Sequence, residues 1–317
     1  MKDVAMKEKM MYYGVILAQR FTHKQKQFFY EQINERFNDL GFQVALQSES
    51  FRYNSVNNII IGDIDKASKL IVAAYDTPTY IHFFDAKYYP FNSKKNSEQD
   101  LLYLLIQLLV TTLLGGLLYF VISDIASFSL VIKIVSIAFS IAVVLAIIWL
   151  FLTKSNPINF NRNSAALAVI EAVGEMCDTE EVAFVLLDYG VNSYQGHKVF
   201  CQSYSVTKPV LLLDAIAYGE TVVIAHRDNI DVEVYLKDDK LKIVDKIYDE
   251  RQAESNTLAF FKKASILTTG SIEKGQFIVR NVRSKKDHQV DMERLSLITN
   301  LIVNDIKGER KCSYDNT

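Results

Sequence analysis

The sequence predicts an α/β domain with a mostly parallel central sheet and helices on both faces, interrupted by a two-helix transmembrane hairpin. Short, continuously apolar runs such as 69–74 and 182–187 are typical of parallel strands covered on both faces. Helix-forming segments alternate with these runs, as in layered α/β proteins. Two much longer apolar segments, 101–122 and 130–152, separate the two halves of this pattern.

The part before the hairpin predicts one helix followed by three strands. Residues 23–40 have Phe28, Ile33 and Phe37 at helical spacing, and Gly41 is a stop signal. The strand-like runs that follow are 42–46, 58–62 and 69–74.

The N-terminal segment 10–18 is weakly apolar but is not a secretory signal. Tyr12, Tyr13 and Gly14 interrupt it, and Gln19 and Arg20 stand where a cleavage site needs small residues. We expect a short buried strand here.

Segment 101–122 has no charged residue, and as a helix it would span roughly 33 Å, enough for a bilayer core of about 30 Å. Segment 130–152 has one charge, Lys133, near its start, where a lysine reaches the interface. Trp149 lies near its other end, at the depth that tryptophan prefers. The connection 123–129 is too short for a domain, so the two helices run antiparallel and both flanks lie on one side.

Positive charge near the helix ends predicts the orientation. The outer flanks contain five basic residues and the connecting loop none: Lys87, Lys94, Lys95, Lys154 and Arg162. We therefore expect a two-helix protein of the cell membrane, with the soluble domain and both termini in the cytoplasm.

After the hairpin the α/β pattern resumes. Residues 163–176 predict a helix, and a closing helix runs from Asp291 to Ile306, ahead of Gly308. Predicted strands are 182–187, 209–214, 221–226, 231–236, 241–247, 264–268 and 276–280. Neither half has enough elements to close a core alone. The predicted division is 1–98 and 155–308 as two parts of one domain, 99–154 as the hairpin and 309–317 as a tail.

The overall composition excludes some classes of function. The net charge of −2 gives no basic face for nucleic acid. The three cysteines, Cys177, Cys201 and Cys312, form no C-x-x-C pair, so neither a disulfide framework nor a thiolate zinc site is indicated.

Five motifs in order resemble the two-zinc aminopeptidases of peptidase family M28. Residues 58–62 and 70–77 resemble the strand pair that ends in His-Tyr-Asp-Thr, and 161–166 resembles an Asn-Asp-Asn-Ala-Ser-Gly turn. Residues 184–196 resemble the Phe-Asp-Gly-Glu-Glu segment. The strand 211–214 and the segment 283–295 match the last two motifs. The resemblance implies a zinc-aminopeptidase-like fold.

The positions that would carry the family's chemistry are mostly replaced. Two-metal hydrolysis needs imidazole and carboxylate ligands and a carboxylate base. The resemblance places Ala74 and Arg283 at histidine ligands, Arg162 at the bridging aspartate, Gly190 at the general base and Val191 at a glutamate ligand. Only Asp214, an aspartate ligand, and Asp76, a neighbouring aspartate, remain. These substitutions predict a pseudo-peptidase without a catalytic residue, metal or other cofactor.

The two arginines have two interpretations. They either pair with Asp76 and Asp214 in place of the metal ions or point into solvent. A rearranged metal site from Asp76, His82 and Asp214, with His197 nearby, is a further alternative.

The leading prediction is a membrane-anchored, non-catalytic domain that binds a peptide or protein partner or scaffolds a membrane complex. One alternative is an active metal-dependent aminopeptidase with an atypical zinc site. The second is an accessory subunit of a membrane transport or export system. In that case Gly115, Gly116, Ser136, Ser140 and Ala142 would allow close helix packing. These small residues are equally compatible with packing of the hairpin on itself.

Overall fold

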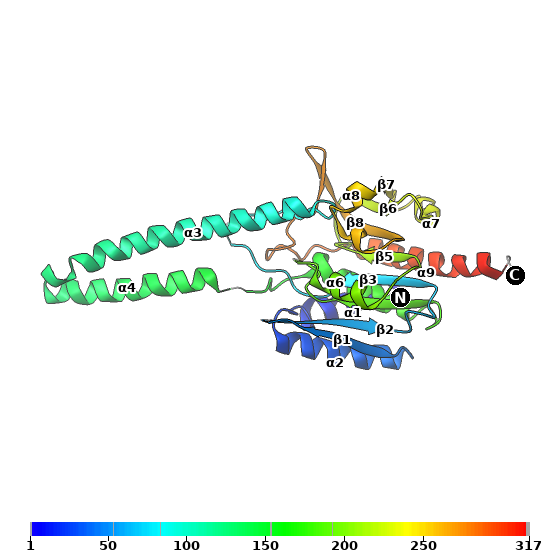
Figure 1. The fold of residues 1–317 in the computed structure, drawn as a ribbon, viewed down its shortest axis with the longest axis horizontal. Coiled ribbons are helices and arrows are strands. Elements are labelled where there is room, and N and C mark those ends of the chain that lie inside the picture. The colour runs from blue at the N-terminus through cyan, green and yellow to red at the C-terminus, as the bar shows by residue number, and fades with distance from the viewer. Residues whose placement is uncertain (1, 53, 83, 153, 192, 315–317) are drawn as a thin grey trace.

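The computed structural model describes residues 2–314 apart from 53, 83, 153 and 192, and describes only the backbone of 2–3 and 309–314. The main helices are α1 (Lys2–Met11), α2 (His23–Asp39), α3 (Ser93–Ser123), α4 (Leu130–Phe151), α5 (Ala165–Gly174), α6 (Gln195–Ser203) and α9 (Met292–Tyr314). The short helices α7 and α8 span Glu233–Leu236 and Glu250–Ala253. The strands are β1 (Val44–Ser50), β2 (Ser55–Ile61), β3 (Lys69–Ala74), β4 (Val182–Leu187), β5 (Val210–Leu213), β6 (Thr221–Arg227), β7 (Val244–Tyr248), β8 (Ala264–Glu273) and β9 (Gln276–Ile278). Figure 1 shows their arrangement.

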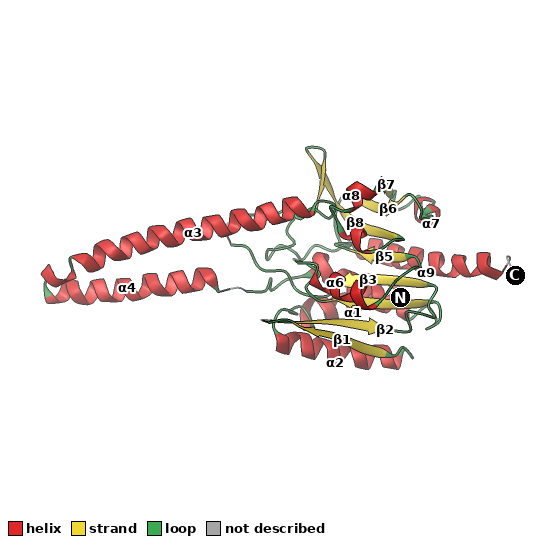
Figure 2. Ribbon diagram, viewed as in Figure 1, coloured by secondary structure: helices red, strands yellow, loops and turns green. Residues whose placement is uncertain are grey.

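One sheet contains strands from both sides of the hairpin (Figure 2). Its order is β1-β2-β4-β3-β5-β8-β6-β7, with β9 beside β8. The central strands β4, β3, β5 and β8 are mutually parallel. Ala74 is opposite Leu187 and Ala73 is opposite Leu213, so the three central strands end at the same edge.

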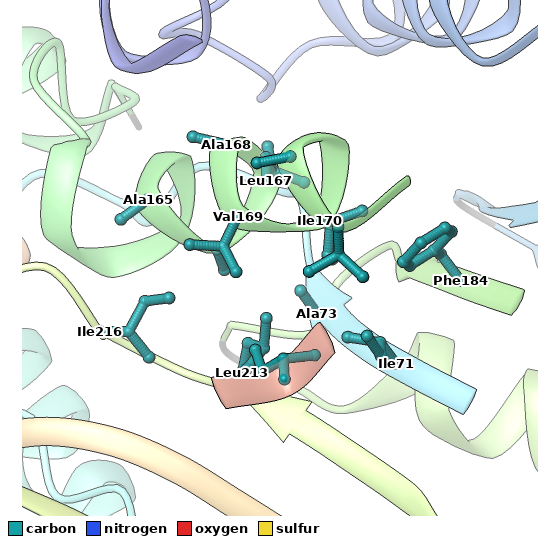
Figure 3. Close-up of a cluster of buried hydrophobic side chains, with 14 of the residues drawn as sticks. Ile71, Ala73, Ala165, Leu167, Ala168, Val169, Ile170, Phe184, Leu213 and Ile216 are labelled. Carbon is teal, nitrogen blue, oxygen red and sulfur yellow. The ribbon is translucent and has the colours of Figure 1, made fainter. Parts of the chain in front are cut away.

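Helices cover both faces of the sheet, which explains the continuously apolar strands. Figure 3 shows α5 lying over β3 and β5, with Val169 and Ile170 facing Ile71, Ala73 and Leu213. Helices α1, α2 and α9 contribute to the same buried cluster. Residues from α6 and α8 belong to the cluster on the other face. The α/β fold predicted from the sequence is confirmed.

The N-terminal prediction was wrong. Residues 10–18 contain the end of α1 and the π-helical turn η1 (Tyr12–Ile16) instead of a strand. Met6, Met10, Tyr13 and Leu17 are all buried, and this spacing is helical. The helical pattern of buried residues begins at Met6, before the segment 10–18, so the segment alone does not reveal it.

Two further predictions were wrong. Residues 231–236 form a turn and α7, because the Asp231 carboxylate accepts a hydrogen bond from the Glu233 N–H and only Val232 and Tyr235 are buried. Gly308 does not end the last helix, which continues through it to Tyr314.

The hairpin projects from one end of the domain (Figure 1). Both helices are long and apolar enough to cross a membrane. Most of their apolar side chains are exposed, so the pair is not a core element of the domain. They contact each other: the Gln107 side chain donates to the Leu150 carbonyl at 2.7 Å. Helix α3 starts at Ser93, so its first turns precede the predicted apolar segment.

The base of the hairpin is bonded to the domain through the loop that follows β3. Tyr80 N–H donates to the Lys154 carbonyl at 2.9 Å, and Asn156 N–H donates to the Pro78 carbonyl at 2.8 Å. Ile81 N–H donates to the Arg283 carbonyl at 3.1 Å. We call these segments, 78–82, 154–157 and 281–285, the collar.

Candidate functional site

The candidate site lies where the central strands end. Asp76 follows β3, Gly190 follows β4 and Asp214 follows β5, and in open α/β sheets this edge is where ligands bind. Arg162 comes from the π-helical turn η3 (Phe160–Ser164) just before α5. The sequence stretches separated by the hairpin meet here, because the Asn163 side chain donates a hydrogen bond to the Asp76 carbonyl.

Arg162 forms an ion pair with Asp214 in the interior of the site. The Arg162 side chain is 3% exposed, and one Nη contacts Asp214 Oδ1. The Tyr88 hydroxyl donates to Asp214 Oδ2 at 2.5 Å, and the Tyr88 ring lies 3.8 Å from the guanidinium carbon. Asp287 accepts the Arg162 N–H at 3.4 Å, which fixes the turn. Of the two interpretations of Arg162, the structure has the pairing with Asp214 and not the exposed side chain.

Asp76 is not paired with an arginine that the sequence singled out. Its Oδ1 accepts the Gly190 N–H at 2.8 Å and the Val191 N–H at 3.2 Å, so the carboxylate holds the loop after β4. Burial, together with the nearby Asp188 carboxylate, raises the pKa of Asp76 to about 6. The interpretation in which Arg283 pairs with Asp76 does not hold, because Arg283 contacts Thr79 and Asp100 instead.

Arg283 turns away from the two aspartates. Its Nε donates to the Thr79 carbonyl at 3.0 Å, and its Nη1 forms an ion pair with Asp100. Asp100 lies in α3, in the polar turns that precede the apolar segment. The collar positions Arg283 beside the hairpin, so this residue links the site to α3 instead of replacing a metal ion.

The space next to Asp214 is almost filled. The inner pocket, lined by Ala74, Gly190, Arg162, His197 and Asp214 among others, has a volume of about 20 Å³, room for about one water molecule. A Cβ atom on Gly190 would lie 2.6 Å from the Ala74 Cβ, so these two small residues pack directly together. Burial lowers the pKa of His197 to about 3, and its Nδ1 has no partner among the described residues.

A larger outer pocket of about 280 Å³ adjoins the inner one. The lining side chains with most bearing on its chemistry are Ser93, Ser97, Asp100, Arg162, Tyr194 and Arg283. Val191 also lines it. The first turns of α3 therefore form one wall, and Arg162, Val191 and Arg283 contribute to the rest.

The residues present do not fit a zinc centre. The Arg162 guanidinium lies beside Asp214, and its positive charge would repel a divalent cation. Within the part of the chain that the structure describes, no three His, Cys, Asp or Glu side chains come together as a metal site. His82 contacts Tyr80 and Trp149 at the base of the hairpin, and it lines a different pocket from Asp214.

Sequence reasoning missed Arg20, Tyr88, Tyr194 and Asp100. Arg20 is fully buried: its N–H donates to Thr77 Oγ1 at 2.8 Å and its side chain to the Tyr75 carbonyl at 2.6 Å. It therefore clamps the loop that carries Asp76. Of the four, only Asp100 had a visible signal, as the last charge before the apolar segment.

Several solved structures have a similar fold. A Porphyromonas gingivalis glutaminyl cyclase superposes with a TM-score of 0.53 at 8% identity, over 97% of each chain. A Zn-dependent exopeptidase from Parabacteroides distasonis gives 0.51 at 11% identity, over 96% of each chain. The domain has the aminopeptidase-like fold.

A third structure, the Legionella pneumophila aminopeptidase LapA, gives a TM-score of 0.50 at 10% identity, over 96% of this chain and 69% of LapA. No protein-family model and no curated protein matches the sequence. At these identities the similarity establishes the fold, and the chemistry depends on the side chains described above.

Proposed function

We propose that this chain is a membrane-anchored, non-catalytic peptidase-like domain that binds a short peptide segment or a protein end in the outer pocket. The observation that carries the proposal is the buried ion pair of Arg162 with Asp214 in the place that metal chemistry would need. Two-metal hydrolysis needs several anionic or neutral donors, and this position supplies one carboxylate that is already neutralised.

The remaining positions favour the same conclusion. Gly190 has no carboxylate to take a proton from water, a role typically worth about 10²–10⁴-fold in rate. Ala74 and Val191 offer no donor atom. Since the inner pocket holds about 20 Å³, a substrate carbonyl has no room beside Asp214 either.

The outer pocket suits a peptide end by its polarity. Arg283 uses Nε for Thr79 and Nη1 for Asp100, and a guanidinium has five donor hydrogens, so donors remain for a carboxylate or carbonyl. Ser93 and Ser97 from α3 and Tyr194 from the opposite wall add hydroxyl groups. A ligand in this pocket would touch the hairpin and the sheet edge together.

Membrane anchoring is supported by the two apolar helices and by the basic residues at their outer flanks. Lys94 and Lys95 lie in the first turn of α3, and Lys154 follows α4, whereas the connection 123–129 has no lysine or arginine. The positive-inside tendency then places the domain in the cytoplasm.

Enzyme assays and peptide binding test the proposal. The full chain, purified in mild detergent with added zinc, should show neither aminopeptidase activity nor cyclisation of N-terminal glutamine. On an array of short peptides with free ends it should bind a defined subset. Ser97→Trp, which fills the pocket, should abolish this binding, whereas Glu98→Trp on the next residue of α3 should preserve it. Chelator-sensitive turnover, or equal binding by both variants, would refute the proposal.

A second candidate is an accessory subunit of a membrane transport or export complex. It is favoured by Gly115 and Gly116, since a Cβ added to either would meet nothing within 4 Å among the described atoms. Such glycines permit close approach of another helix. If a complex forms there, Gly116→Leu should reduce co-purification of its members from mild detergent, and Leu117→Ile should not.

A further inference from the structure

A separate pocket lies at the base of the hairpin, outside the site described above. Its volume is about 630 Å³, and it opens between the collar and the end of α4. The residues that determine its chemistry are Phe21, Tyr80, His82, Trp149, Lys154 and Lys285. Its lining comes from residues 19–25, the loop after β3, the last turn of α4, residues 154–157 and Lys285.

The pocket is cationic. Its described lining contains two lysines and no aspartate or glutamate. Neither Lys154 nor Lys285 forms an ion pair with a carboxylate in the described part of the chain, unlike Lys87 and Arg283 near the outer pocket. Burial lowers the pKa of His82, and the charges of Lys154 and Lys285 lower it further. Two ammonium groups therefore face one space without an anion of the protein to neutralise them.

With the hairpin inserted as proposed above, the aromatic residues would lie at the depth of lipid headgroups. Trp149 lies in the last turn of α4, its ring 4.8 Å from the His82 ring, and the Tyr80 and His82 rings are 4.5 Å apart. Lys154 Nζ lies 5.4 Å from the Trp149 ring. Tryptophan and lysine in this order at a helix end are typical of the boundary between the apolar core and the headgroups.

We propose that this pocket binds the phosphate group of an anionic phospholipid headgroup. The lysines supply the charge, and the rings of Trp149 and Tyr80 pack against the glycerol region. A zwitterionic headgroup is disfavoured because its trimethylammonium group would approach the two lysines. The bound lipid would lie against the collar, whose other side carries Arg283. The inference rests on the membrane insertion of the hairpin proposed above.

The test uses Trp149, the only tryptophan in the chain. Dioctanoyl phosphatidylglycerol, dioctanoyl phosphatidylcholine and inorganic phosphate are titrated separately into the full chain in maltoside micelles. Phosphatidylglycerol should give a saturable change in tryptophan emission, with phosphatidylcholine and inorganic phosphate giving none at the same concentrations. The changes Lys154→Gln and Lys285→Gln together should raise the half-saturation concentration roughly thirtyfold, since each lysine near an anionic surface contributes about 1 kcal/mol.

Lys285→Gln alone separates binding from direct effects on the probe, because Lys154 itself lies beside Trp149. It should raise the half-saturation concentration roughly fivefold. The matched control is Lys262→Gln with Lys263→Gln, two exposed lysines just before β8 at the opposite edge of the sheet. This control should titrate as the wild type does.

Three results would refute the headgroup pocket: equal emission changes with the two lipids, an unchanged half-saturation concentration in the double variant, or an emission change with inorganic phosphate alone. Flotation with phosphatidylcholine vesicles separates this failure from failure of the hairpin proposal. A chain that does not float refutes membrane insertion. A chain that floats but shows no response specific to phosphatidylglycerol refutes only the headgroup pocket.

Discussion

Replacing Arg162 by alanine should destabilise the domain strongly. The variant leaves the Asp214 carboxylate, 17% exposed, with the Tyr88 hydroxyl as its remaining hydrogen-bond donor among the described contacts. Removing one partner of a buried ion pair typically costs about 3–5 kcal/mol. The contact of the guanidinium with the Tyr88 ring adds to this loss.

The assay is thermal unfolding of the detergent-solubilised full chain, followed by brief proteolysis that digests only unfolded domain. A domain of this size loses about 2–4 °C per kcal/mol, so Arg162→Ala should melt roughly 6–20 °C below the wild type. The control Arg251→Ala removes an exposed arginine of α8 and should shift the midpoint by less than about 2 °C.

A double variant identifies the cause. Asp214→Asn keeps an acceptor for Tyr88 and removes the charge that Arg162 neutralises. Arg162→Ala with Asp214→Asn should therefore melt higher than the sum of the two single losses predicts, with a coupling free energy above about 1 kcal/mol. If Arg162→Ala melts like the control, or if the two losses simply add, the guanidinium does not stabilise Asp214 and the reasoning fails.

Three other predictions concern the site and the hairpin. Because the pKa of Asp76 is raised to about 6, its folded state binds protons more tightly than the unfolded chain; the stability that Asp76 contributes is present below about pH 3.8 and is lost as pH rises through about 6. The melting temperature of Asp76→Asn relative to the wild type should therefore rise between about pH 4 and 6 and stay constant above pH 7. A melting-temperature difference that is the same at every pH would contradict the raised pKa. Gly190→Glu should lower the melting temperature and restore no hydrolysis, because its Cβ would meet Ala74; Gly308→Ala in α9, also without hydrolysis, is the comparison for a glycine with nothing within 4 Å among the described atoms. In a Cys312→Ser background, Ser127→Cys should react with an impermeant maleimide on intact cells and Ser50→Cys only after lysis; the native Cys177 and Cys201 contribute little because burial raises the pKa of each thiol to about 11. Labelling in the reverse order would contradict the proposed topology.

The sequence was sufficient for the elements with a complete hydrophobic pattern. Strands 69–74 and 182–187 are found with the predicted bounds, and α2 ends two residues before Gly41, whose φ of +86° suits the residue after a helix cap. The pattern of 231–236 was misleading because alternation over so few residues does not distinguish a strand from a turn with two buried side chains. Helix α6 was missed because only four of its residues are buried.

The site could be predicted only in part, for a physical reason. The ends of parallel strands meet at one edge of a sheet, so the closeness of Asp76, Gly190 and Asp214 follows from the order of the elements. Side-chain direction does not follow from it. The hydrogen bonds of the collar turn Arg283 toward Asp100, and the carbonyls around Arg20 fix the loop of Asp76. These contacts join residues far apart in the chain, so local sequence patterns do not predict them.

The zinc content of the purified protein tests the pseudo-peptidase proposal most directly. The full chain is prepared with zinc in the growth medium, dialysed against metal-free buffer and examined by elemental analysis, beside a zinc aminopeptidase treated in the same way. The ion pair of Arg162 with Asp214 predicts far less than one zinc per chain, while the aminopeptidase retains its metal. One or more zinc ions per chain, lost together with aminopeptidase activity on chelation, would show that the site is a working metal centre.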